Sequence, residues 1–101
     1  LFRSLCDGPR GTADYIEIAR YFHTVFLSDI PIIEKHEHDR AIRFISLIDE
    51  FYDRNVKLIL SAEVPIDQLY NATQLSFVFE RTQSRLLEMQ SHEYLARGHK
   101  P

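Results

Sequence analysis

The sequence has few of the features that cross-link or anchor particular classes of protein. Its 101 residues include one cysteine, Cys6, so an internal disulfide framework is excluded and we expect a protein of a reducing compartment. No apolar run approaches the roughly 20 residues that span a bilayer, and no signal peptide or lipidation motif is visible. We therefore expect a cytoplasmic protein without a transmembrane segment.

Charge of one sign does not dominate the sequence either. Lysine and arginine number 12 and aspartate and glutamate 15, which gives a net charge of −3. Because an overall basic field is absent, we expect no nucleic acid as a partner, and any anion site has to be local. A phosphate-binding loop of the form G-x-x-x-x-G-K-[ST] is also absent. This chain alone is therefore expected to bind neither ATP nor Mg²⁺ by the usual means, and we assign it no catalytic residue.

What the sequence does contain is a strand, a helix and a second strand in immediate succession over residues 24–62. Residues 24–27 are β-branched and aromatic with no polar side, which is typical of a strand buried on both faces. Residues 39–53 carry apolar side chains at helical spacing, and Asn55 follows as the terminator. Residues 56–60 then form a second, mostly apolar strand. A helix of this length between two strands favours parallel pairing.

This succession predicts an α/β fold: a three-layer fragment with a parallel strand-helix-strand core and flanking helices. Residues 1–101 form a single domain, which is short for a complete doubly wound enzyme and is expected to be part of a larger protein. The apolar stripe of the central helix consists of Ala41, Phe44, Ile45, Ile48, Phe51 and Tyr52. Its opposite side, which includes Asp49, is expected to face water.

A helix before the first strand is expected to pack on the sheet, and the segment after this strand is expected to be an exposed loop. Thr12 is expected to cap a helix whose packed side includes Tyr15, Ala19 and Phe22. Residues 32–38 connect the first strand to the central helix and begin with two exposed-looking apolar residues, followed by charged ones. Such a loop leaves the carboxyl end of a strand, where open α/β sheets place their sites.

The last third of the sequence gives a mixed pattern. Residues 65–70 predict a short helical turn that begins at a proline. Residues 75–78 alternate like a short strand or belong to a loop, and a helix is expected from Phe79 onward. Ser91 is expected to cap a final turn that carries Tyr94.

Two arginines of this last helix are the first candidates for a site. Arg81 and Arg85 are four residues apart, so they share one helix face, where like charges repel by a few tenths of a kcal/mol. Guanidinium groups suit phosphates and carboxylates, and such a pair is a candidate contact for an anion or a nucleotide. The alternative is a solvated face that Glu80 and Glu88 partly neutralise, and spacing alone favours this alternative.

The ends of the two core strands supply a second pair of candidates. Asp29 follows the first strand, where a carboxylate holds the metal in a nucleotide-binding sheet, and Ser61 follows the second strand. The alternative for Asp29 is a turn-forming aspartate ahead of Pro31, and the turn is the favoured interpretation.

His36, His38 and Asp39 have the residue types of a metal site, but their spacing is poor. No second ligand pair stands at a helical or C-x-x-C interval, and zinc normally takes three or four well-placed ligands. A charged, hydrated loop is favoured, so we expect no metal here and regard a metal-dependent enzyme as remote.

Four segments of the sequence resemble segments of a known protein family. They are residues 14–16 (D-Y-I), 43–52 (R-F-I-S-L-I-D-E-F-Y), 56–62 (V-K-L-I-L-S-A) and 80–91 (E-R-T-Q-S-R-L-L-E-M-Q-S). They resemble the carboxyl-terminal portion of the ZapE-like P-loop ATPases of the AAA class, a family that includes the mitochondrial lactation-elevated ATPases. The resemblance covers essentially the whole chain.

The resemblance implies an ATPase whose Walker A and Walker B motifs lie upstream, so that ATP and Mg²⁺ belong to the full-length protein only. It further implies a role in bacterial cell division, the division-ring protein FtsZ as a partner, and possible assembly into a homo-oligomer. Within residues 26–70 it makes Asp29 and Ser61 degenerate Walker B and sensor positions, because the adjacent glutamate and the sensing asparagine are missing. The resemblance strengthens the prediction that Arg81 and Arg85 contact a nucleotide, since AAA-type ATPases complete their sites with arginines.

The sequence therefore predicts the non-catalytic carboxyl-terminal α/β domain of a ZapE-like ATPase, which packs on the upstream ATPase domain and contributes arginine contacts. An alternative of a different class is a protein-interaction module that binds a division or quality-control partner. In that case residues 32–38 and the exposed face of the central helix would do the binding.

Overall fold

The computed structural model describes residues 11–71 and 75–98; the segment that carries Cys6 lies outside this part. The elements in chain order are α1 (Thr12–Tyr21), β1 (Thr24–Ile30), β2 (Ile33–Glu34), α2 (His38–Asp53), β3 (Lys57–Ala62), the 3₁₀ helix η2 (Ile66–Gln68), β4 (Tyr70–Asn71), α3 (Ser76–Glu88) and α4 (His92–Ala96). None of the described helices combines the length and the apolar character needed to traverse a bilayer.

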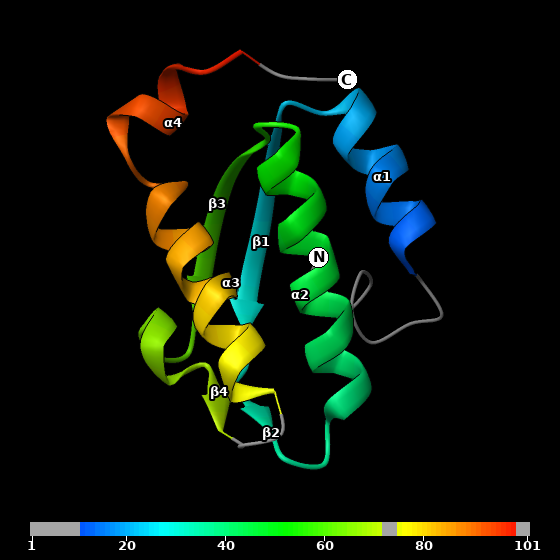
Figure 1. The fold of residues 1–101 in the computed structure, drawn as a ribbon, viewed down its shortest axis with the longest axis vertical. Coiled ribbons are helices and arrows are strands. Elements are labelled where there is room, and N and C mark those ends of the chain that lie inside the picture. Colours follow the sequence, from blue (N-terminus) through cyan, green and yellow to red (C-terminus); the bar gives the residue numbers. More distant parts are fainter. Residues whose placement is uncertain (1–10, 72–74, 99–101) are drawn as a thin grey trace.

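The centre of the fold is the parallel pair of β1 and β3, joined by α2 (Figure 1). The register runs from Thr24 opposite Lys57 to Leu27 opposite Leu60, and an irregularity then separates Leu27 from Ile30. The prediction of an α/β fold with a parallel strand-helix-strand core is confirmed.

The predicted apolar stripe of α2 forms much of the core. Ala41, Phe44, Ile45, Ile48 and Phe51 are buried, while Tyr52 lies half-buried at the edge of the stripe. Periodicity also missed one member, because Leu47 is fully buried beside the stripe.

Asn55 ends α2 as predicted. Its φ of 55° lies in the left-handed region, which asparagine tolerates and β-branched residues avoid. The Asn55 side-chain amide also donates to the carbonyl oxygen of Gly98 at 3.2 Å. The residue therefore ends the helix and ties the chain's last described residue to the core.

The sheet of β1 and β3 corrects one prediction, since within residues 11–71 and 75–98 only one of its faces is covered. Val25, Leu27 and Ile30 of β1 are buried, but Phe26 between them is 62% exposed. Ile59, directly opposite Phe26 on β3, is 50% exposed. The apolar run predicted burial on both faces, whereas the described helices cover the face of Leu27 alone.

Residues 32–38 differ from the predicted exposed connection. Ile33 is fully buried and belongs to β2, which pairs in parallel with β4. The Ile33 backbone N–H donates to the carbonyl oxygen of Leu69 at 2.7 Å. The two-residue strand was missed because it is too short to show alternation.

At the amino-terminal end of the described chain, α1 packs beside α2 (Figure 1). Its cap position is Gly11 rather than the predicted Thr12, and the Asp14 carboxylate accepts a hydrogen bond from the Gly11 N–H at 3.0 Å. Tyr15 and Ala19 are buried as expected. Phe22, however, has extended backbone beyond the helix end and is 57% exposed.

At the other end, α3 begins at Ser76, three residues before the predicted start. The alternation of residues 75–78 fitted a strand equally well, but helical spacing places Phe79, Thr82 and Leu86 in the core and leaves Phe77 86% exposed. The strand or loop interpretation is wrong for residues 76–78. The predicted cap of α4 is confirmed, because Ser91 Oγ accepts from the Tyr94 N–H at 3.1 Å.

Candidate functional site

The two candidate arginines on α3 share one carboxylate, that of Asp49 on α2. Arg81 Nη2 lies 3.3 Å from Asp49 Oδ2, and Arg85 Nη1 contacts the other oxygen, Asp49 Oδ1. The exposed fraction is 54% for the Arg81 side chain and 26% for both Arg85 and Asp49. Asp49 was expected to face water, and the structure instead places it in the contact between two helices.

Arg85 is held by a second contact. Its guanidinium carbon lies 5.0 Å from the centroid of the Tyr52 ring, a cation–π geometry. The Tyr52 hydroxyl in turn donates to Glu88 Oε2 at 2.8 Å. This hydrogen bond, followed by burial and by the charge of Glu88, raises the pKa of Tyr52 above its usual value. Arg85 is therefore a structural link between α2 and α3.

The network continues into α4. Arg97 Nη1 lies 3.3 Å from Glu88 Oε2, and the Arg97 guanidinium stands 5.6 Å from the centroid of the Tyr94 ring. The rings of Tyr52 and Tyr94 are stacked with centroids 6.0 Å apart. We call the set Asp49, Tyr52, Arg81, Arg85, Glu88, Tyr94 and Arg97 the α2–α3–α4 cluster.

Tyr94 anchors this cluster to the core. The residue is fully buried, and its hydroxyl lies 2.6 Å from the Val56 carbonyl oxygen and 3.2 Å from that of Phe51. These carbonyls belong to the end of α2 and the approach to β3. Burial is the main cause that raises the pKa of Tyr94 above its usual value. Tyr94 thus attaches the short helix α4 to the segment between α2 and β3.

The ion pairs of the α2–α3–α4 cluster leave one arginine partly available to another anion. Asp49 carries one negative charge and meets two guanidinium groups, while Glu88 meets Arg97. Of the two arginines on Asp49, Arg85 has the ring contact and the lower exposure, whereas Arg81 has the longer ion-pair distance and is half exposed. An exposed ion pair contributes roughly 0–1 kcal/mol, so the geometry allows Arg81 to exchange Asp49 for another anion.

Asp29 and Ser61 are brought together at the carboxyl ends of β1 and β3. The Asp29 backbone N–H donates to Ser61 Oγ at 2.9 Å, and both residues are exposed. The φ of Asp29 is 58°, in the left-handed region, at the irregularity that interrupts the register. The predicted position at the strand ends is confirmed, while the assignment as degenerate Walker B and sensor positions stays a prediction.

The structure does not join these two pairs of candidates. In Figure 1, α2 runs antiparallel to β1, so the later turns of α2, which carry Asp49, lie toward the amino ends of the strands. Asp29 and Ser61 stand at the opposite ends. The described contacts of Arg81 and Arg85 go to Asp49 and Tyr52, whereas Asp29 contacts Ser61.

The histidine-containing loop shows local contacts. His36, His38 and Asp39 are exposed. Among the described residues, no three His, Cys, Asp or Glu side chains gather in a way that would hold a metal ion. Glu37 Oε2 lies 2.6 Å from Arg40 Nη1, and Glu37 Oε1 accepts from the Glu34 N–H at 2.9 Å, so the acidic residues here stabilise the start of α2.

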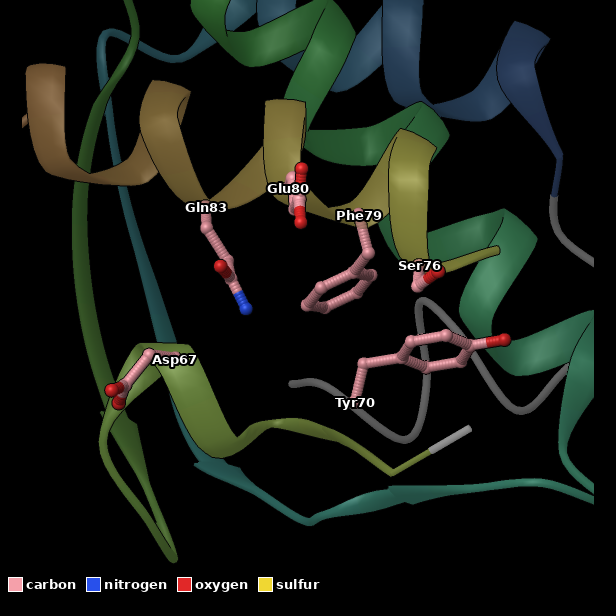
Figure 2. A pocket seen from close by; sticks show the side chains of 6 residues that line it. All are labelled: Asp67, Tyr70, Ser76, Phe79, Glu80 and Gln83. Atoms are coloured by element: carbon pink, nitrogen blue, oxygen red, sulfur yellow. The ribbon is translucent and has the colours of Figure 1, made fainter. Parts of the chain in front are cut away.

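A pocket of about 220 Å³ lies between η2 and α3 (Figure 2). It is lined by Asp67, Tyr70, Ser76, Phe79, Glu80 and Gln83. The rings of Tyr70 and Phe79 are stacked with centroids 5.0 Å apart and form one wall. Figure 2 shows the Asp67 carboxylate directed away from these rings, so the polar groups do not converge on a common point. The pocket contains none of the predicted site residues.

Sequence reasoning missed Asp49 as the partner of both arginines. The contacts join residues 32 and 36 positions apart, which local spacing does not reveal. One signal was present, since Asp49 follows Ile45 by four residues and precedes Tyr52 by three. Asp49 therefore borders the apolar stripe, and a carboxylate at this position lies close to any helix that packs on the stripe.

Comparisons with known proteins show the family to which this chain is similar. A family model described as AFG1-like ATPase matches residues 1–98. The cell division protein ZapE of Escherichia coli (strain K12) is 51% identical over 98 residues, which are 97% of this chain and 26% of that protein. Lactation elevated protein 1 homolog B of Danio rerio is 33% identical and covers 96% of this chain and 26% of its own length.

No solved structure matches the chain significantly. The chain spans about a quarter of the length of the curated relatives that it matches, 26% in each of the two cases above. Since the family model covers nearly all of the sequence, the chain belongs to the AFG1-like ATPase family.

Proposed function

We propose that these residues form the carboxyl-terminal α/β domain of an AFG1-like ATPase that acts in bacterial cell division. The proposal is supported by 51% identity to the cell division protein ZapE of Escherichia coli. ATP and Mg²⁺ would be held by the rest of the polypeptide, because the phosphate-binding motif is absent from these 101 residues. A cytoplasmic location, assembly into a homo-oligomer and binding to FtsZ stay predictions of the resemblance.

Within this domain, we propose that Arg81 contacts an anion, a phosphate of the nucleotide or an acidic group of the neighbouring domain. The observation that carries this proposal is that two guanidinium groups share the single carboxylate of Asp49 while Arg81 stays 54% exposed. The anion would belong to the rest of the polypeptide or to a neighbouring copy. Arg85 would position the helix rather than meet the anion.

The test is ATP turnover by the full-length protein that carries Arg81→Ala, with Arg20→Ala as the matched control on α1. An arginine at a transferred phosphate contributes about 10³–10⁵ in rate, so a loss of at least about 100-fold is expected for Arg81→Ala. The Arg20→Ala protein, which lacks an exposed arginine outside the cluster, should turn over ATP at the wild-type rate. Normal turnover by Arg81→Ala would refute the nucleotide contact.

The interaction-module alternative finds less support in the geometry. Ile33 in residues 32–38 is fully buried, and Asn71 Nδ2 donates to Glu34 Oε2 at 3.1 Å, so part of this segment packs on the domain itself. On α2, Asp49 is also engaged, as described above. We therefore retain the ATPase domain as the proposal.

A further inference from the structure

The proposed function leaves one feature unused, the face of the β1–β3 sheet that none of the described helices covers. Its centre is the cross-strand pair of Phe26 and Ile59, which are 62% and 50% exposed. Ser28 and Ser61, the next outward-facing residues toward the carboxyl ends, are also exposed. The face is thus an apolar spot with a polar border on one side.

Burial along the strands shows that this exposure belongs to one whole face. Along β1, the buried residues Val25 and Leu27 alternate with the exposed residues Phe26 and Ser28. Along β3, Leu58 and Leu60 are partly buried and pack against the core, whereas Ile59 between them points to the other side. In Figure 1, α2 and α3 lie on the covered face.

A parallel sheet with one bare face is unusual for a finished protein. Parallel sheets occur almost only with both faces covered by helices, because each crossover between parallel strands places a helix on one face or the other. The exposed face therefore indicates that further structure covers Phe26 and Ile59.

The length of the relatives indicates what that structure is. This chain corresponds to 26% of each of the curated relatives described above, so nearly three quarters of such a protein lies outside these residues. We infer that an apolar helix of the remaining ATPase polypeptide docks on Phe26 and Ile59 and completes a helix-sheet-helix arrangement. The inference rests on the proposed function in one respect, that these residues are part of a longer ATPase.

Hydroxyl-radical footprinting of the unsubstituted full-length protein, without nucleotide, tests this inference. The oxidation rate of each side chain in the native protein is divided by its rate in denaturant. Phe79, which is 1% exposed, serves as the internal reference for a buried phenylalanine. Phe26 and Ile59 are expected to be oxidised more slowly in the native protein than in denaturant, with a ratio in the range of that of Phe79. Native rates close to the denatured rates would overturn the inference.

Repeating the footprint at decreasing protein concentration, with the mass followed by light scattering, identifies the occupant. Protection that persists in the monomer supports docking within one polypeptide. Protection that disappears as an oligomer dissociates would mean that a second copy covers the face, and would overturn the inference as well. Because no arginine variant or ATP is used, protection of Phe26 without Arg81-dependent turnover would uphold the docking and refute only the anion contact.

Discussion

Charged residues are held differently in two regions of the molecule, the carboxyl ends of β1 and β3 and the α2–α3–α4 cluster. At the strand ends, Asp29 is exposed and is fixed through its backbone, which donates to Ser61 Oγ. In the cluster, the charged side chains themselves join three helices, with Asp49 between two arginines. The position of Asp29 follows from strand topology, whereas the role of Asp49 depends on partners far away in the sequence. The cluster should therefore contribute more to stability than the strand ends do.

The largest effect is expected for Tyr94→Ala, which removes the buried anchor of the cluster. Truncation of a buried aromatic side chain to alanine costs about 3–5 kcal/mol, and this residue also loses its hydrogen bonding to Val56 and Phe51. Urea unfolding of the protein measures the loss. Leu95→Ala, at a 47% exposed neighbour, is the matched control and should cost about 1 kcal/mol or less. Equal losses for both variants would contradict the anchoring role.

Tyr94 also gives the protein an alkaline pH dependence. The pKa of its phenol is raised in the folded state, chiefly by burial, above the unfolded value of about 10. The folded state therefore retains the proton longer, and the stabilisation is present in full below about pH 10 and is lost as the pH rises through the folded-state pKa. The urea concentration at the midpoint of unfolding, measured from pH 8 upward, should decrease above about pH 10. The decrease should be less steep in Tyr94→Phe. Parallel curves would exclude Tyr94 as the cause.

The next effect is expected for Asp49→Ala, which leaves two guanidinium groups without their shared carboxylate. Arg85 is 26% exposed and stays in the contact between helices, so we expect a loss of about 1–2 kcal/mol in the free energy of unfolding. Asp53→Ala, at an exposed aspartate of the same helix, should change it by about 0.5 kcal/mol or less. If the two variants unfold at the same urea concentration, the cluster is not a stabilising unit.

The smallest effect is expected at the strand ends. Asp29 holds a φ of 58°, where a side chain costs roughly 1 kcal/mol and glycine is not penalised. Asp29→Gly should therefore be more stable than Asp29→Ala by about 0.5–1 kcal/mol in urea unfolding. Greater stability of the alanine variant would show that the backbone here carries no strain.

Strong local patterns predicted the core well. The stripe of α2 and the two flanking strands could be located because periodicity over residues 39–53 and the apolar runs on either side agree with one another. Residues 76–78 were misassigned because a four-residue alternation fits a strand and the first turn of a helix equally well. The exposure of Phe26 was missed for a different reason. An apolar run predicts burial of both faces of a strand, but it does not show that the neighbouring segments cover both faces.

The candidate site was predictable only in part. The shared helix face of Arg81 and Arg85 follows from a spacing of four residues, but their partner on α2 does not. Long-range ion pairs leave no periodic signal, because the contact is made by the packing of helices rather than by the chain that joins them. The sequence therefore identified the cations, and the structure identified Asp49 and distinguished the half-exposed Arg81 from the more buried Arg85.

A double-mutant cycle on ATP turnover by the full-length protein tests the central claim most directly. The variants are Arg81→Ala, Asp49→Asn and the combination of both. If Arg81 contacts a phosphate of the nucleotide, Arg81→Ala should lower turnover by at least about 100-fold in the wild-type and in the Asp49→Asn background alike. If the only role of Arg81 is to pair with Asp49, the double variant will be no slower than Asp49→Asn alone, and the proposed anion contact is wrong.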